Sequence, residues 1–289
     1  MDERNIFLSF FYSSVMVDLV SVLMFSFAAG LVGAVTGLGG SSIATPVLVL
    51  LGVPIKEAVA AGIVSVIATS SGSASLYIRE GLVNTPAAMF LEPFTIVGGM
   101  VGASVTVLID PRLVAVVFAA VILFSMITLY MLGNRQVGDV KQDRFSEWLG
   151  LKGSYFDQSL GKDVSYRLSN AFLGGLGMSA AGFFAGMLGI GAGAFKVAIH
   201  ELVLKMPPKV STTTSNFIIG MTALAGSSIY FSSGLIVVDL AAPLAVGTSL
   251  GAFIGSRLLR SMSERASRIA YFATASLSVL LMLVRVFRG

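Results

Sequence analysis

Long, nearly uncharged apolar runs constrain the fold of this chain more than any other feature. A helix of about 20 apolar residues crosses the hydrocarbon core of a bilayer. Eight runs of this kind are bounded by charges, prolines or glycines: 17–35, 58–78, 86–108, 113–132, 168–188, 210–231, 236–257 and 266–284. Two shorter apolar segments, 42–52 and 194–204, follow glycine-rich stretches and would cross about half of the core. We therefore predict an all-α polytopic membrane protein with eight long and two short membrane segments.

The composition agrees with this and excludes several function classes. Of 289 residues, 55% are hydrophobic and 12% are charged, whereas about a quarter are charged in soluble domains. This balance argues against a disordered, fibrous or nucleic-acid-binding protein. With no cysteine and one histidine, the chain has no thiolate site and no histidine-rich metal centre, and we expect no cofactor. Residues 1–14 carry two acidic residues before Arg4 and no small-residue cleavage site, so we expect no removable signal peptide.

The second half of the sequence repeats the first. Gly37-Leu38-Gly39-Gly40 matches Gly189-Ile190-Gly191-Ala192 at a shift of 152 residues. One inserted residue later the shift is 153, and it aligns prolines, tyrosines, turn glycines and charges: Pro54 with Pro207, Lys56 with Lys209, Tyr77 with Tyr230, Gly98 with Gly251, Gly102 with Gly255 and Arg112 with Arg265. Such matches arise by chance less readily than matches between apolar residues. The predicted organisation is an N-terminal segment 1–16, a first transmembrane repeat 17–133, a connecting loop 134–167 and a second transmembrane repeat 168–289.

The distribution of lysine and arginine predicts how the repeats are oriented, because these residues concentrate in cytoplasmic loops. If each short segment and the span before it return the chain to the same side, the repeats are inverted and both termini lie outside. The loop 134–167 is then cytoplasmic, and 13 basic residues lie inside against five outside. If the short segments add no membrane crossing, 10 basic residues lie inside and eight lie outside. We predict inverted repeats, a recurrent plan of secondary transporters, and the plasma membrane of a prokaryote, because eukaryotic targeting features are lacking.

The connecting loop 134–167 is the one stretch of soluble composition, with six basic and five acidic residues and the single tryptophan. Phe145, Trp148, Leu149 and Leu151 would fit one apolar face of a short helix lying on the membrane surface. The simpler interpretation is a connector between the repeats, since 34 residues are too few for a second domain.

Two glycine-rich stretches, 33–42 and 186–196, lie where a long span gives way to a short segment. Glycine lets the backbone leave the helix, and irregular backbone persists at membrane depth only where it is buried or lines a cavity. The N–H groups of the short helix that follows would face that cavity and suit an anion. The alternative is close helix packing through small residues. The candidate substrate-binding residues of these stretches are Gly37, Gly39, Gly40, Ser41, Ser42, Gly189, Gly191, Ala192, Gly193 and Lys196.

Polar side chains inside the apolar runs add further candidates. Lys196 would neutralise an anionic substrate, or else snorkel or pair with Glu201. Glu92 lies before a proline inside a span, so it is a candidate for carrying a coupling proton, for capping the gap at Pro93, or for lying near the interface. A run of hydroxyl and amide side chains suits an oxyanion, or else hydrogen bonds between helices: Thr213, Thr214, Ser215 and Asn216.

These motifs resemble the sulfite exporter TauE/SafE family of membrane proteins, over nearly the whole chain. The matching motifs are Gly37-Leu38-Gly39-Gly40 followed by Pro46, the turn Pro54-Ile55-Lys56-Glu57-Ala58, Gly81-Leu82-Val83, Gly189-Ile190-Gly191-Ala192-Gly193, Thr213-Thr214-Ser215 and Gly234-Leu235. The resemblance implies export or uptake of sulfur-containing or organic anions, such as sulfite and sulfoacetate, driven by an ion gradient. In the first repeat, Ala61-Gly62-Ile63-Val64-Ser65 departs from the small-Gly-Thr-Ser stretch frequent in that family, so the second half would carry more of the site.

The leading hypothesis is therefore a secondary transporter of small anions that works by alternating access around a midplane site. Its partners would be the anionic substrate, the lipid bilayer and a coupling proton or sodium ion. An anion channel, or a permease for another organic acid anion, would use the same site. An intramembrane enzyme would need paired carboxylates or an activated nucleophile, and the spans lack them. The sequence does not decide between a monomer and a homo-oligomer.

Overall fold

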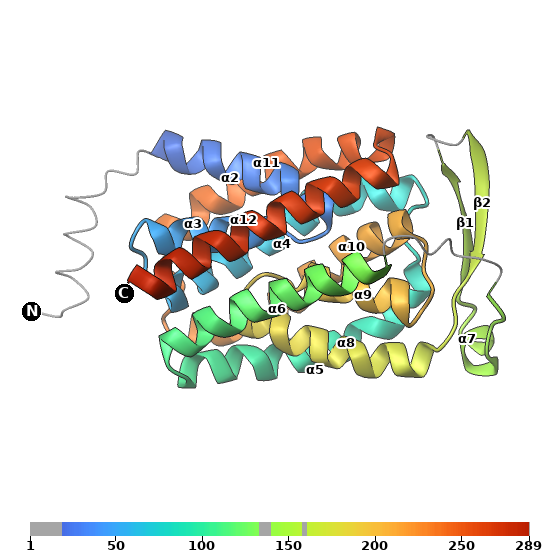
Figure 1. Ribbon diagram of the computed structural model, residues 1–289, viewed down its shortest axis with the longest axis horizontal. Coiled ribbons are helices and arrows are strands. Elements are labelled where there is room, and N and C mark those ends of the chain that lie inside the picture. The colour runs from blue at the N-terminus through green and yellow to red at the C-terminus, as the bar shows by residue number, and fades with distance from the viewer. Residues whose placement is uncertain (1–18, 133–139, 158–160, 289) are drawn as a thin grey trace, which may run out of the picture.

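The computed structural model describes residues 19–132, 140–157 and 161–288. Ten of the helices in these ranges form one elongated bundle (Figure 1). They are α2 (Leu19–Thr36), α3 (Ser41–Leu50), α4 (Ile55–Arg79), α5 (Thr85–Leu108), α6 (Pro111–Leu132), α8 (Ala171–Leu188), α9 (Gly193–Leu202), α10 (Pro208–Ser232), α11 (Val238–Ser261) and α12 (Glu264–Arg288). Both predicted short segments are confirmed as ten-residue helices, α3 and α9.

Six helices of the described chain are long and apolar enough to cross a membrane, so the protein is a multi-pass membrane protein. They are Ile55–Arg79, Thr85–Leu108, Pro111–Thr128, Ala171–Leu188, Val238–Leu259 and Arg265–Val284. The sequence predicts eight. The helix α2 is described only from Leu19, so its apolar stretch is counted over Val20–Thr36. In α10 the polar run 211–216 interrupts the apolar residues. Large apolar side chains such as Met24, Met89 and Leu108 are exposed on the outside of the bundle, as a lipid-facing surface requires.

The two halves of the chain have the same order of elements and make matching contacts. In each half a long helix precedes a break, a short helix and three long helices (Figure 1). The Tyr77 hydroxyl donates to the Ala34 carbonyl at 3.0 Å, and the Tyr230 hydroxyl donates to the Gly186 carbonyl at 2.6 Å. These tyrosines and their acceptors correspond under the shifts of 153 and 152 residues. The duplication seen in the sequence is thus also present in the packing.

Glycines let helices of one half pack closely on helices of the other. A methyl group at Gly251 of α11 would overlap the Phe27 carbonyl of α2, and one at Gly98 of α5 would overlap the Ser179 carbonyl of α8. These two contacts correspond under the repeat shifts. Small residues of this kind allow backbones to approach in membrane bundles. The aligned glycines therefore hold α2 against α11 and α5 against α8.

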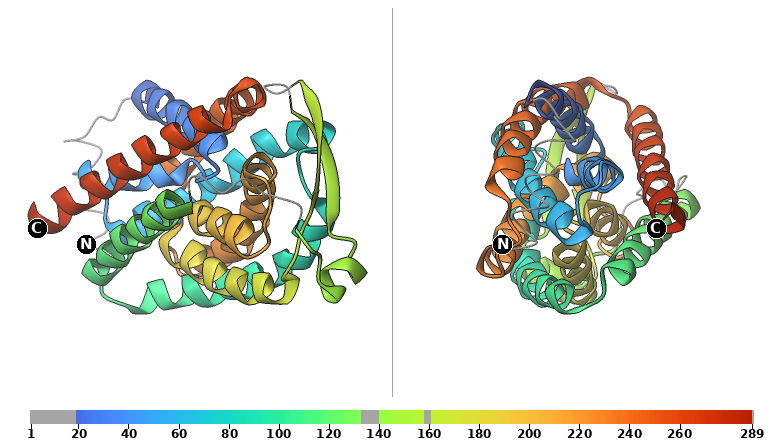
Figure 2. Two further views of the ribbon diagram at one scale, coloured as in Figure 1. Left: turned by 45° about the vertical axis from the view of Figure 1, so that its right-hand side comes forward. Right: turned by 90° about the vertical axis from the view of Figure 1, so that its left-hand side faces the viewer.

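The corresponding helices α4 and α10 cross each other in opposite directions. The Ser70 hydroxyl of α4 donates to the Asn216 carbonyl near the start of α10, at 2.6 Å. Ile63, earlier in α4, packs against Gly226, later in α10. Seen from one end, the bundle has α12 (red) and α6 (green) along one side (Figure 2, right). The same order of elements in the two halves thus surrounds a central antiparallel pair.

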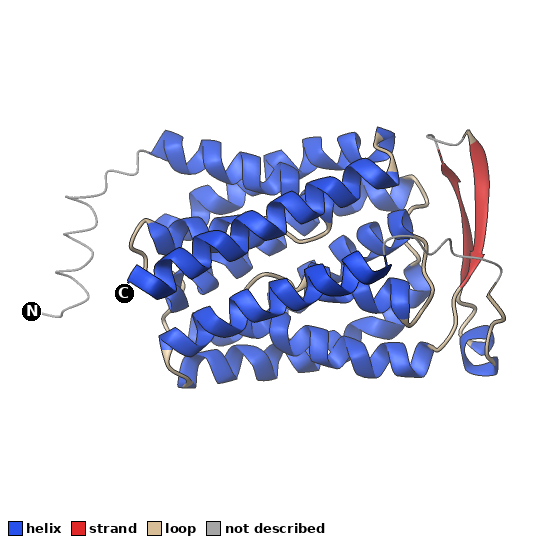
Figure 3. Cartoon of the chain, in the orientation of Figure 1, coloured by secondary structure: helices blue, strands red, loops and turns tan. Residues whose placement is uncertain are grey.

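The connecting segment contains a β-hairpin, which the prediction of an all-α chain missed. It comprises α7 (Arg144–Trp148), β1 (Lys152–Asp157) and β2 (Lys162–Arg167), and the strands pair antiparallel from Lys152↔Arg167 to Asp157↔Lys162. Figure 3 shows these strands (red) at one end of the helical bundle. The first helix drawn, α2, begins at the opposite end, and α12 ends there. One end of the bundle, hereafter the hairpin end, is therefore covered by the connecting segment.

The alternative of one apolar helix face in this segment does not hold for all four residues. Trp148 is 79% exposed, whereas Leu151 is fully buried with Tyr155 and Tyr166 of the hairpin. The helix α7 ends after five residues, so the four apolar residues cannot lie along one helix face. Leu151 instead precedes β1 and accepts a hydrogen bond from the Leu168 N–H at 2.9 Å, which closes the base of the hairpin.

Candidate functional site

The two glycine-rich breaks meet, backbone against backbone, inside the bundle. Gly37 and Gly191 have φ angles of 75° and 68°, in the left-handed region that glycine adopts without strain. A methyl group at Gly193 would overlap the Gly37 carbonyl, and one at Gly39 would lie 3.5 Å from the Ile190 carbonyl. The structure therefore brings together the two stretches that the sequence analysis selected. The chain leaves the helix at both places, and the short helices α3 and α9 begin there.

The first break offers one unengaged hydroxyl. The Gly40 N–H donates to the Thr69 hydroxyl at 3.3 Å, and the Ser42 hydroxyl donates to the Gly39 carbonyl at 2.8 Å. The Ser41 hydroxyl, at the first residue of α3, is fully buried and has no hydrogen-bond partner in the described structure. A buried hydroxyl is normally paired, so Ser41 is the residue of this break best placed to bind a ligand.

The second break contains a residue in an uncommon conformation. Ala192, which precedes α9, has a φ angle of 44°. Few residues other than glycine adopt left-handed φ values, and such strain gathers at functional sites. Gly189 also has a positive φ, of 62°, and a methyl group there would overlap the Val59 carbonyl. The backbone of this break is thus fixed closely by its neighbours.

Matched threonine pairs flank the two breaks. Thr69 and Thr222 correspond under the shift of 153 residues, as do Thr95 and Thr248. Thr222 donates to Thr95 at 2.9 Å. In the other half, a methyl group at Gly40 would lie 2.8 Å from the Thr69 hydroxyl and 3.1 Å from Thr248. Thr222 and Thr95 thus join α10 to α5, and Thr248 joins α11 to α4 by donating to the Ser65 carbonyl at 3.3 Å.

Lys196 is buried beside one of these threonine pairs. Its side chain is fully buried, so it does not snorkel to the surface, and its Nζ donates to the Thr222 hydroxyl at 3.0 Å. Glu201, the partner considered from the sequence, instead accepts a hydrogen bond from Arg268 at 2.9 Å. An ammonium group at this depth is costly unless it has polar or charged company. Lys196 is therefore placed to attract an anion close to the second break.

Glu92 of α5 lies near the same lysine. A chain of hydrogen bonds links the two residues: Lys196 donates to Thr222, Thr222 to Thr95, and the Thr95 hydroxyl to the Glu92 carbonyl. One carboxyl oxygen of Glu92 is buried without a hydrogen-bond partner in the described structure. The corresponding residue of the other half is Ala245, so the duplicated architecture carries one lysine–glutamate pair and is chemically asymmetric.

The polar run at the start of α10 divides between two places. Ser215 donates to the Gly193 carbonyl at 3.4 Å, and the Asn216 amide donates to the Ala34 carbonyl at 2.9 Å. These two side chains therefore lie at the breaks. The Thr213 hydroxyl instead donates to the Leu82 carbonyl at 2.6 Å, and the Thr214 hydroxyl accepts from the Asn84 N–H at 3.1 Å. These threonines hold the turn between α4 and α5.

A small pocket with several polar side chains in its wall lies near the hairpin end, and the sequence analysis missed it. Its walls come from the ends of α2, α9, α10, α11 and α12. The lining residues are Thr36, Val197, Glu201, Pro208, Lys209, Thr212, Leu259, Ser267, Arg268 and Tyr271. Residues so far apart in the chain give no motif. The available signal was Arg268, the only charge in the predicted span 266–284.

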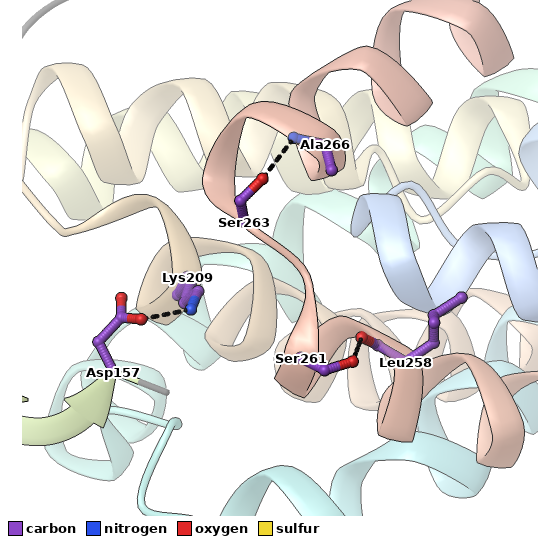
Figure 4. Close-up of polar contacts among 6 residues, drawn as sticks. All are labelled: Asp157, Lys209, Leu258, Ser261, Ser263 and Ala266. Atoms are coloured by element: carbon purple, nitrogen blue, oxygen red, sulfur yellow. Dashed lines mark hydrogen bonds and ion pairs between the residues drawn. The ribbon is translucent and has the colours of Figure 1, made fainter. Parts of the chain in front are cut away.

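An ion pair fastens the hairpin to the rim of this pocket. Lys209 donates to Asp157, the last residue of β1, at 2.8 Å, and both side chains are largely buried. Figure 4 shows this pair together with the turn between α11 and α12, where the Ser263 hydroxyl accepts from the Ala266 N–H at 3.2 Å. Lys209, which binds the connecting segment, and Ser267 of α12 thus line the same pocket.

Comparisons with known proteins identify relatives over most of the chain. The family profile described as "Sulfite exporter TauE/SafE" matches residues 22–282. The chain is 26% identical over 258 residues to "Probable membrane transporter protein YunE" of Bacillus subtilis, covering 85% of this chain and 90% of that one. It is 24% identical over 267 residues to "Probable membrane transporter protein YdhB" of the same organism, covering 91% and 99%. No solved structure matches significantly.

Proposed function

This chain belongs to the sulfite exporter TauE/SafE family, a family of membrane transporters, and from that premise we propose that it is a secondary transporter of small anions. The substrates would be sulfur oxyanions or organosulfonates of the sulfite and sulfoacetate type, carried across the plasma membrane of a prokaryote. The observation that carries the proposal is the meeting of two helix breaks inside the bundle, with a short helix beginning at each. Helix N-termini with irregular backbone are the usual anion sites of broken-helix transporters.

The side chains around the breaks support an anionic substrate. Lys196 supplies a buried positive charge, and Ser41 supplies a hydroxyl that has no partner in the described structure. Ser215 and Asn216 lie at the breaks as further polar contacts. An oxyanion held by a lysine, hydroxyls and backbone N–H groups is stabilised without any metal ion.

The transport cycle we propose is alternating access of inverted repeats. The opposite directions of the corresponding helices α4 and α10 support inversion, because copies related by an axis along the bundle would run in the same direction. The ends of the described chain also support it, since α2 begins and α12 ends opposite the hairpin (Figure 1). Rocking of the halves would expose the breaks to one side of the membrane and then to the other.

Glu92 is our candidate for coupling transport to an ion gradient. It is linked to Lys196 through Thr95 and Thr222, and one of its carboxyl oxygens is buried without a partner in the described structure. An anion binding to Lys196 would compete with Glu92 for the ammonium group. The carboxyl would then take up a proton or a sodium ion, which links substrate binding to coupling-ion binding.

Counterflow in proteoliposomes tests the proposal. Wild-type protein should exchange labelled sulfite or sulfoacetate in a saturable manner. Lys196→Ala should abolish exchange, and Ser41→Ala should raise the half-saturation concentration about tenfold, the value of one hydrogen bond to a charged group. The matched control is Ser71→Ala, since Ser71 is exposed and bonds only within its own helix, to the Ile67 carbonyl. Unchanged exchange in both site variants would place the substrate elsewhere.

The same preparation separates a transporter from an anion channel. A channel built on this site would give ohmic anion current in a planar bilayer and no counterflow. If an organic acid such as acetate shows saturable counterflow and no sulfur compound does, the substrate class is organic acids rather than sulfur compounds. The proposed mechanism would still hold.

A further inference from the structure

The small pocket near the hairpin end contains polar groups that the site at the breaks does not use. Arg268 and Tyr271 are three residues apart on α12, so their side chains share one face of that helix. Both line the pocket. Tyr271 is 2% exposed, and no substrate-binding role was predicted for either residue.

Two donors on the pocket wall are buried without a partner in the described structure: the Arg268 Nη1 and the Tyr271 hydroxyl. The other terminal nitrogen of Arg268 donates to Glu201 at 2.9 Å, and this bond fixes the guanidinium. A guanidinium has only donors, so a partner for Nη1 must be an acceptor. A buried unpaired donor costs about 1–3 kcal/mol, which favours binding of an acceptor here.

The pocket also reaches the first break. Thr36 lines it and is the last residue of α2, directly before Gly37. Thr212 lines it too, and its methyl group would lie 3.0 Å from a methyl placed on Gly37. At its other side the pocket is bordered by Lys209, which binds the hairpin through Asp157. It therefore lies between the hairpin end and the break.

We propose that this pocket is a second anion subsite, in which Arg268 Nη1 and the Tyr271 hydroxyl bind one oxygen-rich face of a small oxyanion or sulfonate on its way between the hairpin end and the breaks. This inference rests on the proposed transport function. Glu201 holds Arg268 in position and leaves one edge of the guanidinium free. The pocket accepts the same ligand chemistry as the breaks but from a different set of helices.

The absence of cysteine allows a direct test in the full-length protein. Ser267 lines the pocket, so Ser267→Cys places the chain's only thiol there. We would measure its rate of reaction with an anionic methanethiosulfonate reagent in nanodiscs, with and without sulfoacetate. Sulfoacetate should slow labelling at least tenfold, and equal concentrations of chloride should not.

A further substitution added to the Ser267→Cys protein shows which side chains sulfoacetate needs in order to protect the thiol. Arg268→Gln should remove protection, and Tyr271→Phe, which keeps the packing, should require about ten times more sulfoacetate for the same protection. Arg268→Lys keeps the charge and should also protect poorly, because it loses the planar edge. The matched control is Arg265→Gln, which removes an exposed arginine of the same helix one turn away and does not line the pocket. Each variant is first checked for a single monodisperse peak.

The outcomes separate this inference from the proposed function. The subsite is overturned if sulfoacetate still protects the thiol in both Arg268→Gln and Tyr271→Phe. It is also overturned if the reagent never reaches the thiol. Neither result affects counterflow at the breaks. Protection that persists in Lys196→Ala, which blocks transport, supports a distinct subsite. Protection in a wild-type protein that exchanges no anion would support the pocket and overturn the transport function.

Discussion

At the scale of single residues, the two breaks depend on glycines because backbone crosses backbone there. Gly193 meets the Gly37 carbonyl where no side chain fits. Gly177 is less constrained, because a methyl group there would lie 3.3 Å from the end of the Ile199 side chain, which can shift more easily than backbone. The same residue type therefore carries very different constraints along one chain.

We expect Gly193→Ala to destabilise the protein by about 1–3 kcal/mol, because the crossing backbones must separate. Thermal unfolding in detergent measures this, with Gly177→Ala as the matched glycine control. The anion affinity of any folded Gly193→Ala protein should fall as well. Equal melting temperatures for the two variants would mean that the breaks do not cross as described.

Only those parts of the candidate site that have a local sequence pattern could be predicted from the sequence. Glycine clusters before half-length apolar segments mark the breaks, and a lysine in an apolar run marks Lys196. The roles of Thr213 and Thr214 were not visible, because their bonds to Leu82 and Asn84 join residues about 130 positions apart. Arg268 and Tyr271 line the pocket together with the ends of other helices, and no spacing in the sequence shows that.

At the scale of elements, the positions of the helices were predicted well, because the length of an apolar run indicates where a membrane helix begins and ends. The short helices α3 and α9 lie within two residues of their predicted bounds. The hairpin was missed because its strands, Lys152–Asp157 and Lys162–Arg167, are only six residues long and do not alternate strictly between polar and apolar residues. Strands are predicted from such alternation, so short irregular runs in a polar loop give a weak signal.

One carboxylate ties the short helix α7 to the start of α8. Asp143 accepts from the Ser146 N–H at 3.1 Å and from the Asn170 N–H at 2.6 Å. Partial burial raises the pKa of this carboxyl, but the hydrogen bonds from the Ser146 hydroxyl and from the Asn170 and Ser146 N–H groups outweigh it, so that the pKa is lowered overall. A carboxyl whose pKa is lower in the folded state stabilises the fold above its unfolded pKa.

This stabilisation should be fully present at neutral pH and should be lost as the pH falls below the usual aspartate range, through the lowered pKa of Asp143. Hydrogen exchange of the Ser146 and Asn170 amides across acidic pH, corrected for intrinsic exchange rates, would follow the loss. Asp143→Asn should show weak protection of both amides at every pH. The control is Asp163→Asn, an exposed carboxyl of the hairpin, which should leave the profile unchanged. Wild-type protection that does not vary with pH would contradict the assignment.

At the scale of the whole molecule, the matched contacts of the two halves imply one architecture used twice with different chemistry. Tyr77 and Tyr230 hold equivalent carbonyls, yet only the second half has a lysine beside its break. The inverted arrangement that we propose predicts that the turn between α5 and α6 and the hairpin face opposite sides of the membrane.

Single-cysteine variants test this orientation in intact cells. Arg112→Cys, just after the turn between α5 and α6, should react with an impermeant maleimide added outside, because the predicted topology puts this turn on the outer surface. Asp163→Cys in the hairpin should react only after the cells are permeabilised. Both positions are exposed, so access to the reagent is set by the membrane side. Labelling of both from outside would rule out the inverted topology.

The connecting segment is bonded to both halves of the molecule. On one side Asp157 binds Lys209 at the start of α10, and on the other Tyr166 accepts a hydrogen bond from Asn84 at the start of α5, at 3.2 Å. The hairpin therefore spans the gap between these two helix starts, beside the direct bonds from Thr213 and Thr214 to the turn before α5. If the two helix starts move apart, the hairpin must detach from one of them, so a probe on the hairpin would report that separation.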